Sequence, residues 1–381
     1  MKRICLLLAL CVFLLSAVPR AGAVELEVAG KSALLMDAAT GTVLYEKNAH
    51  EKLAPASVTK VMTLLLIMEA IDSGKIRWED LVTASEAAAA KGGSQIYLKV
   101  GETMTVTDMV KSIAVSSAND CACAMAEHLA GSEEAFVGRM NEKAQELGMR
   151  DTNFVNCTGL DDGPNASDHK TSAYDIALMS RALLVNHPDI KKYTTIWMDT
   201  VRNGEFGLSN TNKLVRFYSG ATGLKTGFTS AAGYCLSATA ERDGLELIAV
   251  VMGAETSQSR NTACKQLLDY GFANYALVAP NMEQEALVPV RLGNADSIRL
   301  VPGETAQLLI DKALKSGVTT DISLEEEVTA PVTAGQRLGM LTIRSGDRVL
   351  AQIPLVAEAE VARLRWGELL VLTLRKLAMG R

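Results

Sequence analysis

The chain has 381 residues, of which 48% are hydrophobic and 22% are charged, and its formal net charge at pH 7 is −6. This length suffices for two domains, and the composition is typical of a globular protein and not of a disordered one. The acidic balance argues against a nucleic-acid partner, because nucleic-acid-binding domains usually present a basic face.

The first residues have the layout of a secretory signal peptide. Two basic residues start the chain, residues 4–18 form an apolar run, and Ala21–Ala23 offers small side chains for cleavage. The run is short for a membrane span and ends at Pro19. We therefore expect a signal peptide over residues 1–23 and a secreted, extracytoplasmic protein.

Residues 24–280 alternate strand-like and helix-like patterns. A helix is predicted from Pro55 to Ser73, and alanine-rich stretches predict further helices behind it. Strands at both ends of the region, around central helices, predict an α/β domain in which helices cover an antiparallel sheet. The expected hairpins pair Ser32–Met36 with Thr42–Glu46 and Tyr234–Ala240 with Leu245–Met252.

The C-terminal part of the sequence contains two further patterns. Residues 281–356 consist of short strand-like runs between Gly, Pro and Asp turns, which predicts a small β-rich domain. Residues 357–381 form a tail whose last part, 361–381, carries five basic residues and one acidic residue, with a broad apolar arc on a helical wheel. We expect an amphipathic helix that lies on a membrane surface; the alternative is a helix packed on its own domain.

The cysteines and histidines form no local metal-binding motif. The five cysteines that follow residue 23 are scattered, with no Cys-x-x-Cys pair, and we expect buried free thiols. The four histidines lie far apart, without His-Glu-x-x-His spacing, although metal ligands can also converge from distant positions. No phosphate-cradling glycine loop is present either, so the sequence indicates no metal and no cofactor.

The predicted first long helix opens with Ser57-Val58-Thr59-Lys60. The spacing of three places Ser57 and Lys60 on one helix face. A serine hydroxyl needs an adjacent base, and a lysine can serve when burial and a second cation lower its pKa. The same pattern at Ser167–Lys170 lacks the helical context, so we attribute it to chance. The alternative for the first copy is a helix start with a capping serine and a solvated lysine.

Two other short patterns carry polar chemistry. Ser117-Ala118-Asn119 leads into a helical stretch, where the serine can relay a proton and the amide can bind a peptide; Ser259-Arg260-Asn261 has the same spacing. Lys225-Thr226-Gly227 occurs once, just before the second hairpin. On an edge strand its lysine and threonine can bind a carboxylate, and its glycine lets a substrate backbone approach. The alternative is a tight turn with an exposed lysine.

The order Ser-x-x-Lys, Ser-x-Asn, Lys-Thr-Gly is the motif set of penicillin-binding proteins and serine β-lactamases. With Gly92–Gln95, Ala173–Asp175 and Gly223–Gly227, the chain resembles the serine D-alanyl-D-alanine carboxypeptidases, the low-molecular-mass penicillin-binding proteins of peptidase family S11. The resemblance covers nearly the whole mature chain. It implies a β-lactamase/transpeptidase-like α/β fold, a second β-rich domain and a C-terminal amphipathic helix.

The resemblance also implies roles for individual residues. Ser57 attacks the carbonyl between the two terminal D-alanines of a peptidoglycan stem peptide, Lys60 accepts its proton, and Ser117 passes a proton to the leaving amine. The backbone N–H groups of Ser57 and Phe228 form the oxyanion hole, and β-lactam antibiotics act as covalent inhibitors. Phe228 departs from the His or Thr common at that position. The substrate-binding residues that the resemblance implies are Asn119, Lys225, Thr226, Gly227, Phe228 and Arg260.

Two other functions share parts of this pattern. A serine β-lactamase has the same motifs but usually ends after one domain, and class A enzymes add a glutamate that activates the deacylating water. A non-catalytic protein that binds β-lactams or peptidoglycan is expected to have lost at least one motif residue, and none is lost here. We therefore expect a carboxypeptidase that removes the terminal D-alanine from stem pentapeptides at the outer face of the bacterial membrane.

Overall fold

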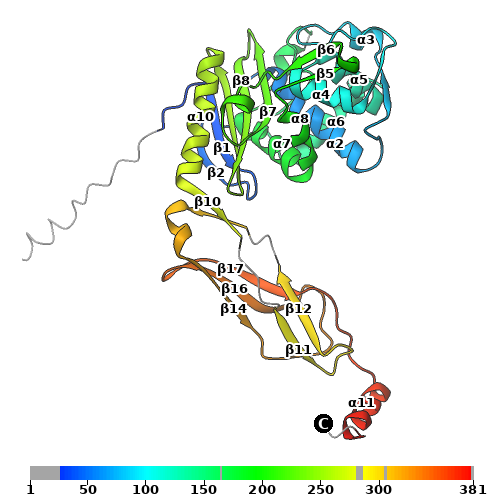
Figure 1. Ribbon diagram of the computed structural model, residues 1–381, viewed down its shortest axis with the longest axis vertical. Helices are drawn as coiled ribbons and strands as arrows, with labels where there is room; N and C mark the ends of the chain where they lie inside the picture. Colours follow the sequence, from blue (N-terminus) through cyan, green and yellow to red (C-terminus); the bar gives the residue numbers. More distant parts are fainter. Residues whose placement is uncertain (1–25, 164, 280–285, 304–306, 379–381) are drawn as a thin grey trace, which may run out of the picture.

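The computed structural model describes residues 26–163, 165–279, 286–303 and 307–378. An α/β domain, a β-rich domain and a C-terminal helix follow one another along the long axis of the molecule (Figure 1). The predicted signal peptide and the predicted domain boundary at residues 280–281 lie outside the described residues.

The α/β domain is built around a five-stranded antiparallel sheet with the order β2-β1-β9-β8-β7. Both predicted hairpins are present, and β9 pairs with β1, which joins the two ends of the domain's sequence in one sheet. The strand β7 forms one edge and β2 the other. The strands are β1 (Ser32–Asp37), β2 (Val43–Lys47), β7 (Ala221–Thr229), β8 (Gly233–Arg242) and β9 (Leu245–Ala254).

Helices cover both faces of this sheet, so its central strand is buried on both sides and reads as a continuous apolar run. The helix α10 (Ser257–Asn274) packs on one face, and α7 (Ala173–Asn186) packs on the other, where α2 (Lys60–Asp72) lies against it. The remaining helices are α3 (Glu86–Ala89), α4 (Val106–Ser116), α5 (Asn119–Ala130), α6 (Glu133–Glu146), α8 (Lys191–Thr194) and α9 (Leu214–Phe217). Two small antiparallel sheets pair β3 (Leu81–Thr83) with β4 (Thr103–Thr105) and β5 (Met198–Val201) with β6 (Phe206–Ser209).

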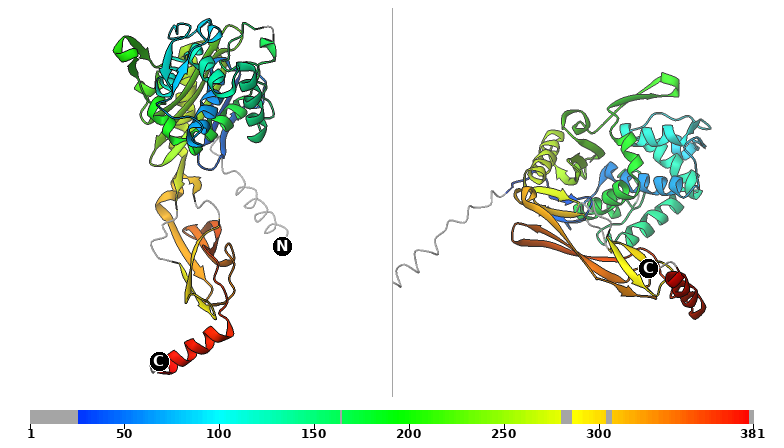
Figure 2. Two further views of the ribbon diagram at one scale, coloured as in Figure 1. Left: turned by 90° about the vertical axis from the view of Figure 1, so that its right-hand side faces the viewer. Right: turned by 60° about the horizontal axis from the view of Figure 1, so that its bottom comes forward.

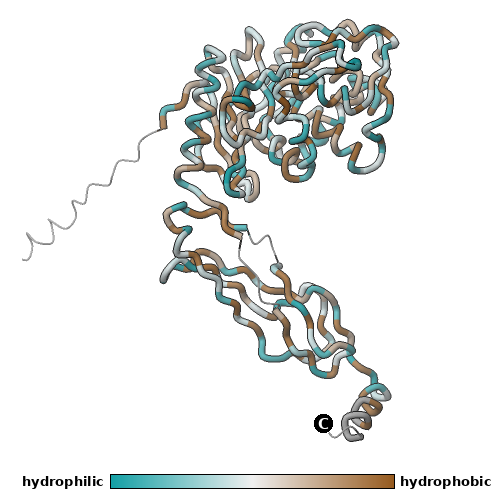
Figure 3. The backbone as a smooth tube through the Cα atoms, in the orientation of Figure 1, coloured by the Kyte–Doolittle hydropathy of each residue, from teal (hydrophilic) through white to brown (hydrophobic). Residues whose placement is uncertain are grey.

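The β-rich domain contains a six-stranded sheet with the order β14-β16-β17-β12-β11-β15. Buried side chains alternate with exposed ones, as in β11. Hydrophobic and hydrophilic residues are interspersed along the strands of this domain (Figure 3). The strand β10 (Tyr275–Val278) continues from α10 and pairs with β13 (Leu308–Asp311). The strands of the larger sheet are β11 (Leu287–Arg291), β12 (Ser297–Pro302), β14 (Val318–Leu324), β15 (Val328–Thr329), β16 (Arg337–Ser345) and β17 (Arg348–Ala357).

The C-terminal helix α11 spans Trp366–Ala378 and projects from the far end of the β-rich domain (Figure 2). It begins at Trp366 and not at residue 357, because residues up to 364 still pair with the β-rich domain: Val361 bridges Val332, and the Leu364 N–H donates to the Leu292 carbonyl. Trp366 is 87% exposed. No helix in the described part of the chain is both long and apolar enough to cross a membrane.

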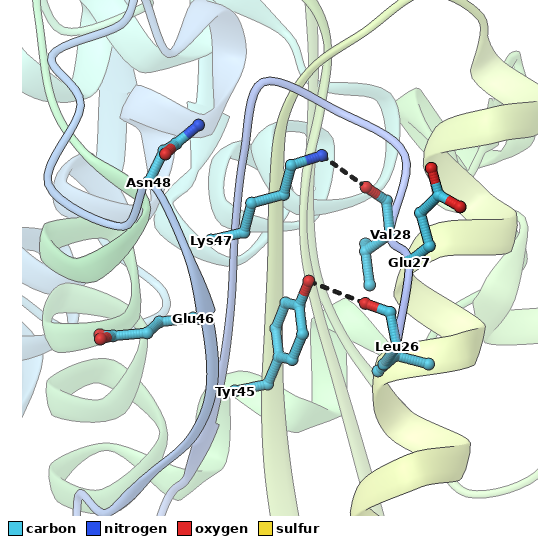
Figure 4. A pocket seen from close by; sticks show the side chains of 7 residues that line it. All are labelled: Leu26, Glu27, Val28, Tyr45, Glu46, Lys47 and Asn48. Atoms are coloured by element: carbon cyan, nitrogen blue, oxygen red, sulfur yellow. Dashed lines mark hydrogen bonds between the residues drawn. The ribbon is translucent and has the colours of Figure 1, made fainter. Parts of the chain in front are cut away.

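The first described residues run beside the β2 edge of the sheet (Figure 4). The Lys47 ammonium donates hydrogen bonds to the carbonyls of Val28 and Gly30, and the Tyr45 hydroxyl donates to the Leu26 carbonyl. These residues help to line a cavity of about 670 Å³. Because β2 and β7 are opposite edges of the sheet, this cavity lies away from the Lys-Thr-Gly motif on β7.

Candidate active site

Ser57 lies in a 3₁₀ turn, Ala56–Thr59, that leads into α2. The α-helix starts at Lys60 and not at Pro55 as predicted, because Ala56 has a φ of +48°, which a regular right-handed helix cannot contain. Gly159 presses on this turn: a Cβ at that position would lie 1.8 Å from the Ala56 carbonyl oxygen. The nucleophile candidate therefore stands on a tight turn held from both sides.

Lys60 is fully buried and points at Ser57. Its Nζ is 2.9 Å from Ser57 Oγ and donates a 2.8 Å hydrogen bond to the Thr158 carbonyl. Burial lowers the pKa of Lys60 to about 7, although Cys157 and Asp120 act in the opposite direction. An amine with this pKa is partly unprotonated at neutral pH and can accept a proton from the serine. The alternative of a solvated lysine is wrong.

Ser117 and Asn119 stand between α4 and α5, where Ser117 ends α4 in the left-handed region with a φ of +63°. The Asn119 Nδ2 donates to the Gly92 carbonyl at 2.7 Å, so the segment Gly92–Gln95 packs against it. Ser117 Oγ and Asn119 Oδ1 are buried and have no hydrogen-bond partner among the described residues. Buried polar atoms normally have partners, and two unpaired ones side by side are typical of a site for a polar ligand.

Lys225 lies on the edge strand β7 and is fully buried, so the alternative of an exposed lysine in a turn is wrong. Burial, together with the positive charges of Lys60 and Arg260, holds the pKa of Lys225 well below its usual value. The two lysines therefore face one site. The neighbouring Thr226 donates from Oγ1 to Thr211 Oγ1 at 2.7 Å.

Gly227 brings β7 against the nucleophile turn. A Cβ at Gly227 would lie 2.7 Å from the Pro55 carbonyl oxygen and 3.1 Å from the Ser57 nitrogen. Only glycine allows this approach, which sets the backbone of Phe228 beside Ser57. The Phe228 ring is 53% exposed and packs against Tyr234 of β8, with ring centroids 4.3 Å apart.

Arg260 is buried at the start of α10 and takes part in the site through its charge. Its guanidinium donates to Asn261 Oδ1 and lies over the ring of Tyr234 at 5.8 Å. It lowers the pKa of Lys225, but its hydrogen bonds are to its own surroundings. Its place is thus behind the site and not in contact with Ser57 or Lys60.

Several contributors have no counterpart among the predicted residues. Thr158 supplies a carbonyl to Lys60, and Thr211 supplies an acceptor to Thr226 while its N–H donates to Val115 of α4, which links the two walls of the site. His169 bonds to Thr59 inside the nucleophile turn. No local pattern marks these residues, because their partners lie far away in the sequence or, for Thr211 and His169, in both a distant and a nearby segment.

The second Ser-x-x-Lys pattern forms no such pair. Ser167 Oγ bonds to Asp168, and Lys170 bridges Asn153. The five cysteines in the described ranges are free and buried, as predicted. Within those ranges, no group of three or more His, Cys, Asp or Glu side chains is placed to hold a metal ion.

Known proteins resemble the chain along most of its length. The family described as D-alanyl-D-alanine carboxypeptidase matches residues 19–256, and the family described as penicillin-binding protein 5, C-terminal domain, matches residues 274–363. The D-alanyl-D-alanine carboxypeptidase DacF of Bacillus subtilis is 42% identical over 376 residues, which cover 95% of each chain.

Solved structures agree with this match. Penicillin-binding protein 5 from Haemophilus influenzae has a TM-score of 0.74 at 30% identity, covering 88% of this chain and 98% of that chain. Penicillin-binding protein D2 from Listeria monocytogenes, solved in an ampicillin-bound form, has a TM-score of 0.59 at 32% identity, covering 65% of this chain and 99% of that chain.

Proposed function

Because this chain belongs to the D-alanyl-D-alanine carboxypeptidase family of penicillin-binding proteins, we propose that it removes the terminal D-alanine from peptidoglycan stem peptides through an acyl-enzyme on Ser57. One observation carries the mechanism. The buried Lys60 amine lies 2.9 Å from Ser57 Oγ, with its pKa lowered to about 7. A serine with such a base beside it is an activated nucleophile.

Acylation uses the groups nearest to Ser57. Lys60 takes the hydroxyl proton while Ser57 Oγ attacks the carbonyl between the two D-alanines. The proton returns through Ser117 to the amine of the leaving D-alanine, which explains why a buried Ser117 hydroxyl has no partner in the described part of the site. Water then hydrolyses the ester and regenerates Ser57.

Substrate binding uses the two walls of the site. Asn119 holds the substrate amide, and Lys225 and Thr226 bind the terminal carboxylate, a favourable partner for a buried ammonium group. Gly227 admits the substrate backbone, and Arg260 adds positive charge behind Lys225.

The oxyanion hole consists of the backbone N–H groups of Ser57 and Phe228. The contact of Gly227 with the nucleophile turn supports this assignment, because it brings these two parts of the backbone together. Each such donor is worth about 3–4 kcal/mol of transition-state stabilisation.

A β-lactam presents the same carbonyl and carboxylate pattern and acylates Ser57, so β-lactams are covalent inhibitors of this enzyme. The match of residues 274–363 to a penicillin-binding protein C-terminal domain favours the carboxypeptidase over a single-domain β-lactamase. The absence of β-lactam turnover is therefore part of the proposal.

The proposal extends to location and domain roles. Residues 1–23 direct secretion, residues 24–280 form the catalytic domain, and the β-rich domain from residue 281, with which residues 357–364 still pair, separates the catalytic domain from α11. Trp366 and Leu370 of α11 are exposed, and basic residues flank them in the sequence. Both features suit an interfacial helix on the outer face of the cell membrane.

The decisive experiment measures D-alanine release from a peptide ending in D-Ala-D-Ala, with the mature chain and its Ser57→Ala variant. We expect release by the parent and none by the variant. Ser167→Ala, which removes the serine of the second Ser-x-x-Lys pattern, is the matched control and keeps full activity. A folded parent that forms a penicilloyl adduct without releasing D-alanine would overturn the carboxypeptidase assignment.

A further inference from the structure

A chain of hydrogen bonds runs from His169 into the nucleophile turn. His169 Nε2 lies 2.7 Å from Thr59 Oγ1, and Thr59 Oγ1 lies 2.8 Å from the carbonyl oxygen of Ala56. Both side chains are buried, with His169 3% exposed and Thr59 fully buried. The described contacts give neither residue a role in the proposed reaction steps, and neither touches Ser57 Oγ.

A backbone N–H determines which atom donates in each of these hydrogen bonds. The Val155 N–H donates to His169 Nδ1 at 3.1 Å, so Nδ1 is the unprotonated nitrogen and Nε2 carries the hydrogen. Nε2–H therefore donates to Thr59 Oγ1, and the Thr59 hydroxyl donates to the Ala56 carbonyl. Each bond strengthens the next, because a hydroxyl that accepts a hydrogen bond becomes a better donor.

The hydrogen-bond series ends at the carbonyl group of Ala56, next to the nucleophile. The Ala56 carbonyl belongs to the same planar peptide group as the Ser57 N–H. A hydrogen bond to the carbonyl draws electron density from the peptide group and makes its N–H a stronger donor. It also holds the plane of a peptide whose first residue has an unfavourable φ of +48°. The orientation of the Ser57 N–H thus depends on what the Ala56 carbonyl contacts.

We propose that His169 and Thr59 are positioning residues that orient and polarise the Ala56–Ser57 peptide group, so that its N–H stabilises the oxyanion. The inference rests on the proposed function, which makes the Ser57 N–H an oxyanion-hole donor. Gly159 completes the arrangement, since a Cβ there would lie 1.8 Å from the Ala56 carbonyl oxygen and 2.8 Å from Thr59 Oγ1, so a larger residue would disturb this hydrogen bond.

The surroundings of His169 keep its imidazole neutral, which the hydrogen bond from Val155 to Nδ1 requires. Lys170 from its own segment and Lys60 from α2 are the charged groups that act on it, and Phe154 packs against its ring edge-on at 5.7 Å. Burial first, and then the two lysines, lower the pKa of His169 to about 4. The imidazole therefore keeps its acceptor for Val155 and its single donor for Thr59 at neutral pH.

Two isosteric variants of His169 separate this role from simple packing. Gln places an amide nitrogen where Nε2 stands and keeps the donor to Thr59, whereas Asn places an oxygen where Nδ1 stands and keeps only the acceptor for Val155. Each variant loses one hydrogen bond. If His169 is merely structural, acylation slows alike in both variants. If His169 has the proposed role, acylation slows in His169→Asn alone.

The measurement is the rate constant for acylation of Ser57 by a fluorescent penicillin, with binding and acylation separated by stopped flow. We expect His169→Asn and Thr59→Val to slow the acylation step about tenfold, a fraction of the effect of losing an oxyanion donor entirely. His169→Gln and Thr59→Ser stay near the parent, and the double variant His169→Asn/Thr59→Val is no slower than either single one. Noncovalent affinity for the penicillin is unchanged throughout.

The stretching frequency of the ester carbonyl gives a second test, because a change in packing alone does not shift it. In the acyl-enzyme, oxyanion-hole donors lower the stretching frequency of the ester carbonyl, which isotope-edited infrared spectroscopy resolves. We expect the frequency to rise in His169→Asn and Thr59→Val and to stay in place in His169→Gln. Equal slowing of the Gln and Asn variants in step with their thermal stability, or an unshifted carbonyl in His169→Asn, would overturn the inference.

The outcome is separable from that of the proposed function. Adduct formation by Ser57→Ala contradicts the nucleophile assignment whatever the His169 variants do. A parent that acylates on Ser57, combined with variants that all match it, contradicts only the positioning role.

Discussion

Two buried amines set the chemistry of the site at the scale of single residues. Burial lowers the pKa of both Lys60 and Lys225, and the positive charge of Lys60 lowers the pKa of Lys225 further. In the proposed mechanism Lys60 serves as the base because its amine contacts Ser57, whereas the Lys225 amine donates to the Thr226 carbonyl. One residue type thus fills two roles that its contacts distinguish.

The pKa of Lys60 predicts how acylation depends on pH. The amine is protonated below about pH 7 and free above it, so the acylation rate constant rises with pH through this region and then levels off. Rate constants for penicillin acylation between pH 5 and 9 test this expectation. A profile that is flat across pH 7 contradicts Lys60 as the base.

Replacing the base tests the same residue without a change of pH. Lys60→Arg keeps a positive charge but cannot give a free base at neutral pH, and we expect acylation to fall about 10²–10⁴-fold. The matched control is Lys170→Arg, because Lys170 belongs to the second Ser-x-x-Lys pattern and, among the described residues, only its backbone pairs, with that of Asn153. Its acylation rate stays at the parent level.

His169 predicts a pH dependence of stability. Its pKa is about 4 in the folded chain and about 6.5 when unfolded, so the stability it contributes is present above pH 6.5 and is lost as the pH falls toward 4. The loss amounts to about 3 kcal/mol. Urea unfolding at pH 7 and pH 4.5 measures it, and His169→Gln shows a smaller decline. Equal declines in both proteins contradict the assignment.

At the scale of elements, the contact between β7 and the 3₁₀ turn before α2 assembles the site. The strand carries the Lys-Thr-Gly motif and the turn carries Ser57, and the two meet where Gly227 lacks a side chain. A β-strand and a helix start can approach so closely only without an intervening Cβ. The close approach of β7 to Ser57 therefore depends on the absence of a side chain at Gly227.

Gly227→Ala tests this contact. The new Cβ meets the Pro55 carbonyl at 2.7 Å, which pushes β7 away from Ser57, and a displacement near 1 Å costs about 100-fold in rate. Gly207→Ala in β6 is the matched control, because a Cβ there has no atom within 4 Å. D-alanine release falls in the first variant and persists in the second. Equal activity of both would show that the contact is not required.

At the scale of the whole molecule, the catalytic domain and α11 lie at opposite ends, with the β-rich domain between them (Figure 2). The chain enters this domain through β10, which continues from α10, and leaves it through Val361 and Leu364, which pair with Val332 and Leu292 of the domain. The tail can therefore be removed from Trp366 onward without cutting into either domain.

Deletion of residues 366–381 tests the role of the tail. We expect the shortened mature chain to acylate with penicillin at the parent rate but to lose sedimentation with vesicles containing anionic lipid, because the exposed apolar side chains of α11 and three of the five basic residues of the tail are gone. The full-length variant Leu370→Glu/Leu374→Glu keeps the chain length and also loses binding. Retained vesicle binding by both would contradict the interfacial helix.

The sequence by itself determined the features that depend on local patterns. The two hairpins, the helical layer and the buried thiols follow from apolar periodicity and residue chemistry within short windows, whereas the sequence left both an edge strand and a tight turn open for the Lys-Thr-Gly motif. The strand β14 shows a similar alternation, since its half-buried Val318, Ile322 and Leu324 stand at alternate positions with exposed polar residues between them.

Only the tertiary structure decided how distant segments complete the site. The Thr158 carbonyl on Lys60, the His169–Thr59 bond and the approach of Gly227 to Pro55 each join parts of the chain about 100 or more residues apart. The left-handed Ala56, which delays α2 until Lys60, likewise follows from contacts with Gly159. Such contacts depend on the packing of whole elements, and no periodicity or spacing within one segment encodes them.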